Sequence, residues 1–323
     1  MILLTGGAGY IGSVVIRDLI KNHDIRVVDL LFYGDDSLKK FRNSIDIINS
    51  DIRKIEKDIL EDVDVIIHLA AVADRRTAKI NPELTEQINI YGTKRIIKIC
   101  KEQGIRKFIF SSTCSVYECE SKSKVLNFDE NITVSPKSIY ARSKYQAENE
   151  ILEAKDKNFQ PVILRQGTVY GFSPRMRYDI FFNRMVKDAF KDGIISIEGE
   201  NIWRPIIEIR DLSRIIQRIV NLYPTNLSNP IINVATNNIK IKQLANTVKT
   251  TFQRKLNSKI KLMLKTNLSK KYWSYAVSTR KLENLLKFNQ KYYIEDGIQY
   301  LLNNILEGNC SDFENPNYYN YKD

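Results

Sequence analysis

Histidine, cysteine and long apolar runs are scarce in this sequence, and each scarcity excludes a class of protein. The 323 residues include only two histidines, which cannot build a multi-histidine metal centre. The four cysteines show no zinc-type pairing, and a cytosolic protein would keep them reduced. No apolar run approaches the ~18 residues of a membrane span, and the first residues carry no signal-peptide pattern. We therefore expect a cytoplasmic protein with no metal and no membrane partner.

Acidic residues are outnumbered by basic ones, which gives a net charge of +12. Such a charge can attract an anionic partner, for example a nucleic acid or a phosphorylated small molecule. The basic residues are scattered along a chain that is rich in Lys, Ile and Asn throughout, and they form no dense tract. We interpret them as a solvated surface and expect no nucleic acid as a partner.

The first half of the chain alternates short apolar runs with helical patterns. Buried strands are predicted at residues 1–4, 25–29, 45–48, 63–69, 107–110 and 161–164. Helices are predicted at residues 13–21, 82–104 and 140–154. This alternation predicts an α/β fold in which helices cover both faces of a parallel sheet.

The pattern changes after about residue 170. Helices are predicted at 178–191 and 211–222, and strands at 194–198 and 231–235. We expect residues 1–170 to form the first domain. Residues 171–308 would form mostly a smaller lobe, with elements that return to the first domain. Residues 309–323 are polar and rich in Asn and Tyr, so a loosely held tail is expected there.

A glycine-rich segment lies between the first predicted strand and the first helix, where a dinucleotide fingerprint requires it. Gly6 permits a tight turn, Gly9 allows close approach of the backbone to a pyrophosphate, and Gly12 allows the helix to pack on the strand. Asp29 ends the second strand, 17 residues after Gly12. A carboxylate there accepts hydrogen bonds from a ribose and repels a 2′-phosphate, which favours NAD over NADP.

Tyr140 and Lys144 open a predicted helix at a spacing that places them on one face. A nearby ammonium and the positively charged nicotinamide ring are expected to lower the pKa of the phenol, so that Tyr140 can take a proton from a substrate hydroxyl. Thr113 follows the fifth strand and can hydrogen-bond the same substrate oxygen. His68 lies in an apolar run, which indicates a structural histidine, so proton transfer is expected to use the tyrosine.

Together these motifs resemble the extended short-chain dehydrogenases of the NAD-dependent epimerase/dehydratase family. The resemblance covers roughly residues 1–300 and implies a Rossmann-type, doubly wound NAD domain with a smaller C-terminal lobe for a nucleotide-linked sugar. It implies that the catalytic residues are Thr113, Tyr140 and Lys144. It implies that NAD is bound by Gly6, Gly9, Tyr10, Ile11, Gly12, Asp29, Asp51, Ile52, Leu69, Ala70, Ala71, Asn89, Ser111, Tyr140 and Lys144. It implies that the substrate is bound by Thr113, Arg177, Asn183 and Arg204.

The sequence departs from the family pattern at several positions. Cys114 and Ser115 stand where the 4,6-dehydratases carry an Asp-Glu pair, so dehydration is not expected. Glu118 replaces a usual glycine and Glu208 a usual histidine. Trp273 occupies the place of an arginine that often binds phosphate, for which Lys270 or Lys271 could substitute.

The function implied by the resemblance is oxidation of a sugar hydroxyl, expected at C4, followed by reduction on the other face, which makes the enzyme an epimerase. A 4-dehydrogenase or 4-ketoreductase, for example on a GDP-linked sugar, is the alternative ending. A non-catalytic Rossmann protein that binds NAD or RNA is a second class, against which Tyr140 and Lys144 argue. The family likeness also implies a homodimer, through the helices at 82–104 and 140–154.

Overall fold

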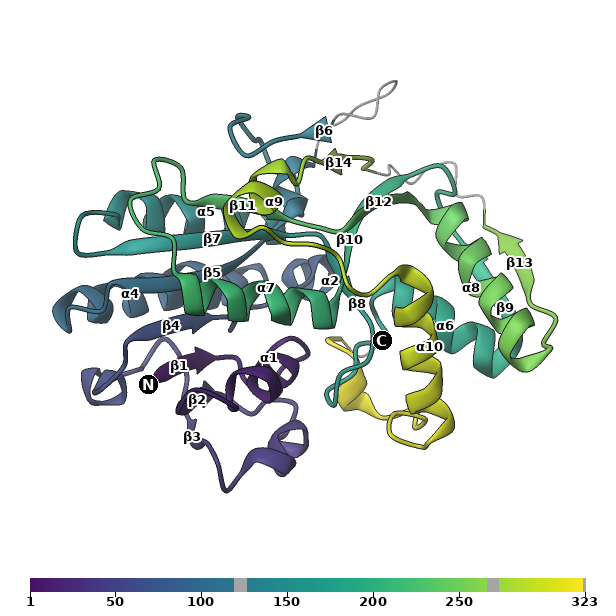
Figure 1. Cartoon of the computed structure of the whole chain (residues 1–323), viewed down its shortest axis with the longest axis horizontal. Coiled ribbons are helices and arrows are strands. Elements are labelled where there is room, and N and C mark those ends of the chain that lie inside the picture. The colour runs from purple at the N-terminus through teal and green to yellow at the C-terminus, as the bar shows by residue number, and fades with distance from the viewer. Residues whose placement is uncertain (119–126, 266–272, 322–323) are drawn as a thin grey trace.

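The computed structural model describes residues 1–118, 127–265 and 273–321. Its centre is a seven-stranded parallel sheet in the order β11-β7-β5-β4-β1-β2-β3 (Figure 1). The strands are β1 (Ile2–Thr5), β2 (Ile25–Asp29), β3 (Asp46–Asn49), β4 (Val65–His68), β5 (Lys107–Thr113), β7 (Gln160–Gln166) and β11 (Ile231–Val234). The chain moves outward from β1 in both directions, so the expected doubly wound Rossmann-type sheet is confirmed.

Both faces of the sheet are covered because its strands are apolar on both sides. In β1, Ile2 and Leu4 belong to one hydrophobic cluster and Leu3 to the other. The first cluster includes residues of α1 (Gly12–Leu19) and α7 (Ile209–Leu222). The second includes residues of α4 (Thr93–Glu102) and α5 (Ile139–Ala154), which pass behind the sheet in Figure 1. The sheet is thus sealed from water, and polar side chains reach solvent only at its edges.

The helix predicted at 82–104 is helical but consists of three pieces. These are α3 (Pro82–Glu86), a π-helical segment, η3 (Gln87–Gly92), and α4. Asn89 lies in the π-helical segment and is buried. The apolar periodicity predicted the helix correctly but carried no signal for the wider turn, which places an amide inside the protein.

The second half builds a smaller set of sheets beside the large one. A three-stranded sheet is formed by β8 (Thr168–Tyr170), β10 (Trp203–Glu208) and β12 (Asn237–Lys240). Two short sheets pair β9 (Ile194–Ile197) with β13 (Lys261–Leu264), and β6 (Asn127–Phe128) with β14 (Ala276–Val277). The helices here are α6 (Phe181–Asp192), α8 (Ile241–Leu256), α9 (Arg280–Leu286) and α10 (Ile294–Leu306). Strand β11 and helix α7 return to the large sheet, as expected.

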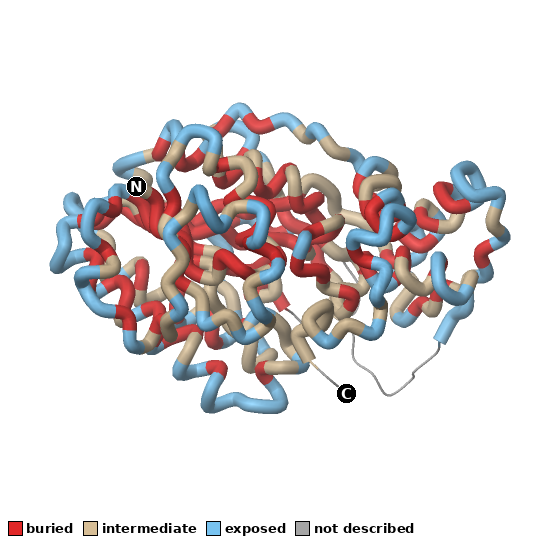
Figure 2. Tube along the Cα trace, turned by 90° about the horizontal axis from the view of Figure 1, so that it is seen from below, coloured by how far each residue is buried: buried red, intermediate tan, exposed pale blue. Residues whose placement is uncertain are grey.

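Short helical turns complete the described part of the chain. They are η1 (Asp36–Phe41), η2 (Lys57–Leu60), α2 (Arg75–Ile80), η4 (Cys114–Tyr117) and η5 (Pro316–Tyr318). Figure 2 shows the buried positions gathered along the centre of the molecule, with exposed residues around them. Among the described residues, no helix is long and apolar enough to cross a membrane.

The expectation of a loosely held C-terminal tail is wrong for residues 309–321. Cys310 is buried, and its carbonyl accepts a hydrogen bond of 2.8 Å from the Tyr178 hydroxyl. The Tyr178 amide donates to the carbonyl of Tyr318 at 2.9 Å. Phe313 packs edge-on against the Tyr178 ring. The polar composition hid these few aromatic contacts, which are enough to attach the segment to the protein.

Candidate active site

The glycine turn after β1 is packed so closely that two of its glycines admit no side chain. Gly6 has a φ of +74°, and a Cβ there would lie 2.7 Å from the backbone nitrogen of Ala70. A Cβ on Gly12 would lie 2.4 Å from the carbonyl oxygen of Gly6. The turn therefore runs directly against the loop after β4, at the carboxyl edge of the sheet where α/β folds bind ligands.

Asp29, at the end of β2, reaches this turn. Its carboxylate accepts hydrogen bonds from the backbone amides of Ala8, at 3.0 Å, and Leu31, at 2.8 Å. Burial raises the pKa of Asp29, and these amides oppose the rise. Each carboxylate oxygen keeps a second lone pair, so the group can still accept hydrogen bonds from a ribose.

The next two residues of the turn, Tyr10 and Ile11, differ in their surroundings. Tyr10 is buried, and its hydroxyl donates to the carbonyl of Gly171 at 2.7 Å. Ile11 is partly buried and contacts the hydrophobic cluster on the α1 side. Ser173 donates to the carbonyl of Tyr10 at 2.7 Å. Tyr10 thus ties the glycine turn to the segment that follows β8.

The other residues expected at the cofactor lie along the same edge. Leu69, Ala70 and Ala71 follow β4 and are partly buried, and Ser111 lies near the end of β5. Asp51 is engaged with its neighbour Arg53, which lowers the pKa of Asp51, and Ile52 is buried beside it. These residues form a row from β3 to β5, on both sides of the glycine turn.

Asn89 organises the loop after β4 from inside the protein. Its side-chain oxygen accepts from the amide of Val72 at 2.8 Å, and its nitrogen donates to the carbonyl of Val72 at 3.0 Å. The same nitrogen donates to the Ser143 hydroxyl of α5 at 2.9 Å. Asn89 thus joins the row at β4 to the helix that carries Tyr140 and Lys144.

The structure brings Thr113 and Tyr140 together. The Thr113 side chain lies near the hydroxyl of Tyr140 and acts to lower the pKa of that phenol, although the two residues come from β5 and α5. Ser138 caps α5 by accepting from the amide of Ala141 at 3.2 Å, which fixes the turn that carries Tyr140. Lys144 is buried, and its Nζ lies 4.2 Å from the centre of the Phe110 ring on β5.

The pKa values of Tyr140 and Lys144 are both shifted by burial. Burial raises the pKa of Tyr140 to about 12, although the Thr113 side chain and the positive charges of Arg177 and Arg75 act to lower it. Burial lowers the pKa of Lys144 to about 7, against the nearby Glu148 carboxylate. In the protein alone the phenol does not have a low pKa, because desolvation outweighs the neighbouring charges. The effect expected from the nicotinamide ring stays a prediction.

His68 confirms the structural interpretation given to it. Its two ring nitrogens contact the hydroxyls of Thr5, at 2.7 Å, and Thr93, at 3.0 Å. Burial lowers the pKa of His68 to about 3. The imidazole is thus neutral at ordinary pH, and both of its nitrogens are occupied by hydroxyls of β1 and α4, the elements that pack around β4.

Arg177 and Arg204 were both expected at the substrate. Arg177 lies near Tyr140, and Arg204 lies on β10 in the three-stranded sheet. Arg177 forms ion pairs with Asp179 and, at 4.0 Å, with Asp74, and its charge acts on Tyr140. Arg204 donates to the carbonyls of Trp203 and Trp273 and has no carboxylate partner among the described residues. Lys270 and Lys271 lie outside the described residues.

The expected role of Asn183 as a substrate ligand is not supported. Asn183 is fully buried, and its oxygen accepts from the amide of Gly171 at 3.0 Å. Its nitrogen donates to the Tyr10 hydroxyl at 3.1 Å and to the carbonyl of Arg177 at 3.0 Å. Both amide hydrogens are used by protein atoms, so in the protein alone Asn183 positions the loop of Arg177, and only its oxygen keeps a free lone pair.

Comparison with known proteins identifies the family. A model of the NAD dependent epimerase/dehydratase family matches residues 2–235. The chain belongs to this family. The resemblance inferred from the motifs is thereby confirmed, and the cofactor that gives the family its name is NAD.

Several similar proteins are named as nucleotide-sugar epimerases. A putative UDP-glucose 4-epimerase of Methanocaldococcus jannaschii is 33% identical over 249 residues, which are 73% of this chain and 77% of the relative. The UDP-glucuronate 4-epimerase of Thermodesulfobacterium geofontis is 29% identical over 322 residues, with 93% and 94% covered. The structure of UDP-glucuronic acid 4-epimerase from Bacillus cereus, in complex with UDP-glucuronic acid and NAD, matches with a TM-score of 0.81 and 25% identity, covering 95% and 99%.

The departure from the family pattern at Glu118 has a structural consequence. Its buried carboxylate accepts from the amide of Ser138 at 3.0 Å and from the Ser138 hydroxyl at 3.1 Å. It also forms an ion pair with Arg75, the first residue of α2. Glu118 thus holds the residue that caps the catalytic helix. The substitution is visible in the sequence, but this role is not, since the partners of Glu118 are far apart in the chain.

The second departure, Glu208, is internal. Its carboxylate accepts from the amide of Arg210 at 2.6 Å and pairs with the Arg210 guanidinium at 2.8 Å. Glu208 caps α7, and burial raises its pKa. This residue stabilises the junction of β10 and α7 and lies outside the row of cofactor residues.

A buried ion pair behind α5 was also missed. Glu148 and Arg165 are both buried and lie 2.7 Å apart, and Arg165 donates to the Tyr117 hydroxyl at 2.9 Å. Ser112 donates to Glu148 from β5. Glu148 follows Lys144 by one helical turn, a spacing that offered a signal for its position but none for its partner on β7.

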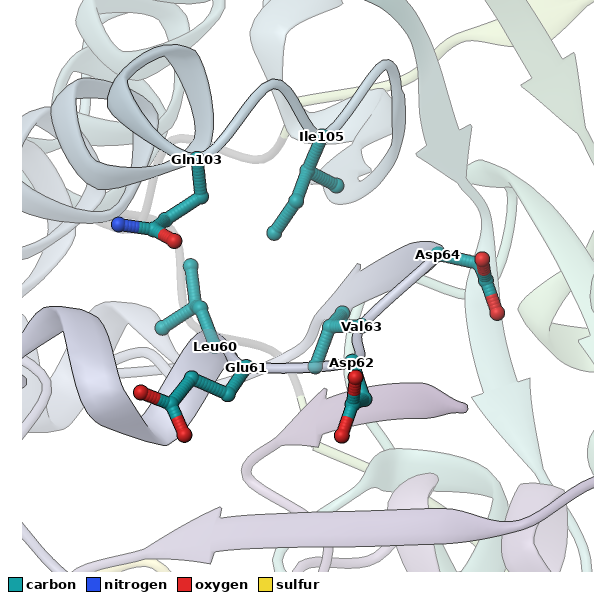
Figure 3. Close-up of a pocket in the computed structure, with 7 residues that line it drawn as sticks. All are labelled: Leu60, Glu61, Asp62, Val63, Asp64, Gln103 and Ile105. Carbon is teal, nitrogen blue, oxygen red and sulfur yellow. The ribbon is translucent and has the colours of Figure 1, made fainter.

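One open hollow in the structure lies at the amino ends of the strands, away from the carboxyl ends where the candidate site lies. Figure 3 shows its lining, formed by residues just before β4 and β5. The lining residues are Leu60, Glu61, Asp62, Val63, Asp64, Gln103 and Ile105. It is found at the amino ends of the strands, where Asp64 is paired with the chain's own N-terminus at 2.7 Å. Ligands of such sheets bind at the carboxyl ends, so we do not place the active site here.

Proposed function

We propose that this protein is an NAD-dependent nucleotide-sugar epimerase that acts by transient oxidation of a sugar hydroxyl at C4. The observation that carries the proposal is the proximity of the Thr113 and Tyr140 side chains at the edge of the sheet where the glycine turn lies. The relatives described above are 4-epimerases of UDP-linked sugars, which supports both the substrate class and the position of the reaction.

The residues at this edge fit the cofactor. Gly9, where a Cβ would meet only the carbonyl oxygen of Gly6 within 4 Å, would leave the backbone bare for a pyrophosphate beside the N-terminus of α1. Asp29 would accept hydrogen bonds from the adenosine ribose, and Ala70 and Ala71 would line the site. When bound, NAD supplies a hydride acceptor with a positively charged ring and later returns the hydride.

Tyr140 would take the proton of the sugar hydroxyl and give it back after the sugar has turned. Because its pKa in the protein is about 12 even with the positive charges of Arg177 and Arg75 nearby, the phenolate needs further stabilisation by the bound cofactor. Thr113 would orient the sugar oxygen through its hydroxyl. Lys144, one helical turn after Tyr140, would hold the ribose next to the reacting ring.

The substrate would be held through its diphosphate by Arg204 and near its sugar by Arg177. Arg204 has no carboxylate partner among the described residues, so its charge is available to an anion. We do not include Asn183, whose amide is used by the protein. The nucleotide would be uridine by analogy with the relatives.

Dehydration would not follow the oxidation. Cys114 is buried, its thiol donates to the carbonyl of Arg165 at 3.0 Å, and burial raises its pKa far above the range of a catalytic base. Ser115 is neutral at ordinary pH. Neither residue supplies the acid and base that elimination of water needs.

The experiment that tests the function is an assay with purified enzyme, UDP-glucose or UDP-glucuronic acid, and no added NAD. Many turnovers per enzyme support the epimerase, because the same cofactor is reused. A single turnover that resumes only with added NAD would show a 4-dehydrogenase. No conversion of any nucleotide sugar, together with salt-sensitive retention on RNA, would support the binding protein instead.

We also propose a homodimer through the helices on the α5 side of the sheet. Exposed apolar side chains gather on the neighbouring helices α2, α3 and η3, where Ile80 is 67%, Leu84 37% and Tyr91 48% exposed. α2 and α3 both pack against α5. A second copy that covered these side chains would remove them from water.

A further inference from the structure

The last described residues of the chain, Tyr319, Asn320 and Tyr321, called the strap below, join two separate loops. The carbonyl of Asn320 accepts hydrogen bonds from the Tyr33 hydroxyl, at 3.1 Å, and from the Thr77 hydroxyl, at 3.3 Å. The Asn320 side chain donates to the carboxylate of Asp74 at 3.3 Å. One residue near the chain end therefore connects the loop after β2 with the beginning of α2.

The residues on either side of Asn320 add separate contacts. The guanidinium of Arg76 lies 4.2 Å from the centre of the Tyr321 ring. The carbonyl of Tyr319 accepts from Arg175 at 3.4 Å. Just before the strap, the amide of Tyr178 holds the carbonyl of Tyr318. The strap is thus fixed at its start and attached at three points beyond it.

These attachment points lie on both sides of the glycine turn. Tyr33 follows Asp29 by four residues, and Asp74 follows Ala71 by three. In the sheet, β2 and β4 are the two neighbours of β1, from which the glycine turn emerges. A segment bonded to the loops after β2 and β4 therefore crosses in front of the turn.

A buried cation lies beneath the strap. Arg175 is only 5% exposed, and its guanidinium lies 3.8 Å from the centre of the Tyr33 ring. It forms no ion pair in the described part of the chain, and its Nε is buried without a hydrogen-bond partner there. Its charge acts on the nearby Asp29 carboxylate. A buried cation with a spare donor next to Asp29 suits an anionic ligand such as a dinucleotide.

The strap can open at small cost. Its three residues are each half-buried and stand near a chain end; only Tyr319 packs against the core, so displacing Asn320 and Tyr321 uncovers little of it. The contacts of the strap are a few hydrogen bonds and three ring contacts, each worth little in water. Opening is therefore compatible with entry of a cofactor, and closure with its retention.

We propose that the strap is part of the cofactor site and closes over bound NAD, which slows its exchange. The inference rests on the proposed function, because an epimerase must keep the same NAD between oxidation and reduction. It adds residues beyond the stretch that the family model matches, since the strap begins 84 residues after position 235. Tyr33, Asp74 and Thr77 thereby become positioning residues for the strap.

The test measures release of NAD in the absence of any sugar. The protein is loaded with NADH, an excess of NAD is added, and loss of the bound NADH fluorescence gives the release rate. A chain that ends at Tyr318 lacks the strap but keeps the contact with Tyr178, and should release NADH about ten times faster or more. Asn320→Ala, which removes the bond to Asp74, should release it about three times faster.

Glu314→Gln is the matched control, because it removes an exposed ion pair with Lys191 that lies before the strap and should leave release unchanged. Wild-type release rates in both strap variants, or tighter NADH binding without the strap, would overturn the proposal. Where the shortened chain fails a thermal unfolding check, Asn320→Ala decides alone. Faster release in a protein that epimerises no sugar would leave the strap standing and reject the proposed function.

Discussion

At the scale of single residues, the proposed chemistry depends on a phenol whose proton is held firmly. The pKa of Tyr140 is raised to about 12 by burial, so its neighbours must share the charge of a phenolate. The sequence identified Tyr140, Thr113 and Lys144 from their order and spacing. It could not give the balance between desolvation and charge, because that balance depends on Arg75 and Arg177, which approach from other parts of the chain.

Tyr140→Phe removes one oxygen and should leave the fold and NAD binding intact. We expect kcat to fall about 100- to 10,000-fold, the range for loss of a general acid-base group. Epimerase activity and cofactor binding are measured on the same preparation. Tyr145→Phe, on the same helix but outside the site, is the control and should retain activity. Near wild-type turnover of Tyr140→Phe would show that another group moves the proton.

Asp29→Ala should weaken the preference for NAD over NADP. In the wild type the carboxylate at the glycine turn repels a 2′-phosphate, so we expect at least tenfold tighter binding of NAD, about 1.4 kcal/mol. In the variant the difference should shrink. Binding titrations with both cofactors give the ratio, and equal affinities in the wild type would argue against this role for Asp29.

Lys144 should make stability depend on pH in a defined direction. Its folded pKa of about 7 lies below the ordinary value of 10.5, so between these values the unfolded chain binds the extra proton. Stability from this group is then lowest at pH 7 and below, and it rises as pH increases toward 10.5, by up to about 1.4 kcal/mol per pH unit. Urea unfolding at pH 7 and pH 9 should show a larger gain for wild type than for Lys144→Met. An identical gain would mean that Lys144 is not desolvated.

At the scale of elements, the catalytic helix is attached to the sheet by polar groups as well as by its apolar face. Its first turn is held through Ser138 and Glu118, and its middle through Glu148 and Arg165. The helix itself was predictable from periodicity. The partners were not, because a buried ion pair between α5 and β7 leaves no pattern in either segment alone. The π-helical turn around Asn89 was not predicted either, because the hydrogen-bond partners of Asn89 lie in other segments of the chain.

Glu148→Ala should destabilise the protein by about 3–5 kcal/mol, since it leaves the Arg165 guanidinium buried without its partner. The double variant Glu148→Leu with Arg165→Met should recover much of this loss, because both charges are gone. Thermal or urea unfolding of the three proteins measures the effect. If the double variant is as unstable as the single one, packing and not charge governs this site.

At the scale of the whole molecule, the apolar runs of the first half predicted six strands and their parallel arrangement, but not the order of the strands in the sheet. The prediction of a loosely held C-terminal tail was wrong, because a few aromatic side chains outweigh a polar composition. The surroundings of Asn183 were not predictable for a related reason: its position matched the family's ligand pattern, and folding brings Tyr10, Gly171 and Arg177 to its amide.

The proposed dimer makes a prediction at this scale. Light scattering should give twice the mass of one chain, and Tyr91→Lys, which adds a charge to an exposed apolar position of η3, should shift the protein toward the single chain. Glu307→Lys, at an exposed position beyond α10, is the control. A monomeric wild type at high concentration would exclude the dimer.

The seventh strand, β11, comes from residues 231–234 and pairs with β7, which itself ends at residue 166. A fragment of residues 1–170 would contain every loop from β1 to β5 that is expected at the cofactor. It would lack β11, the strand that covers the edge of β7. The bare amides and carbonyls of β7, together with the surface vacated by α7, would invite neighbouring copies to pair there. Anyone who expresses the N-terminal half alone should therefore expect inclusion bodies.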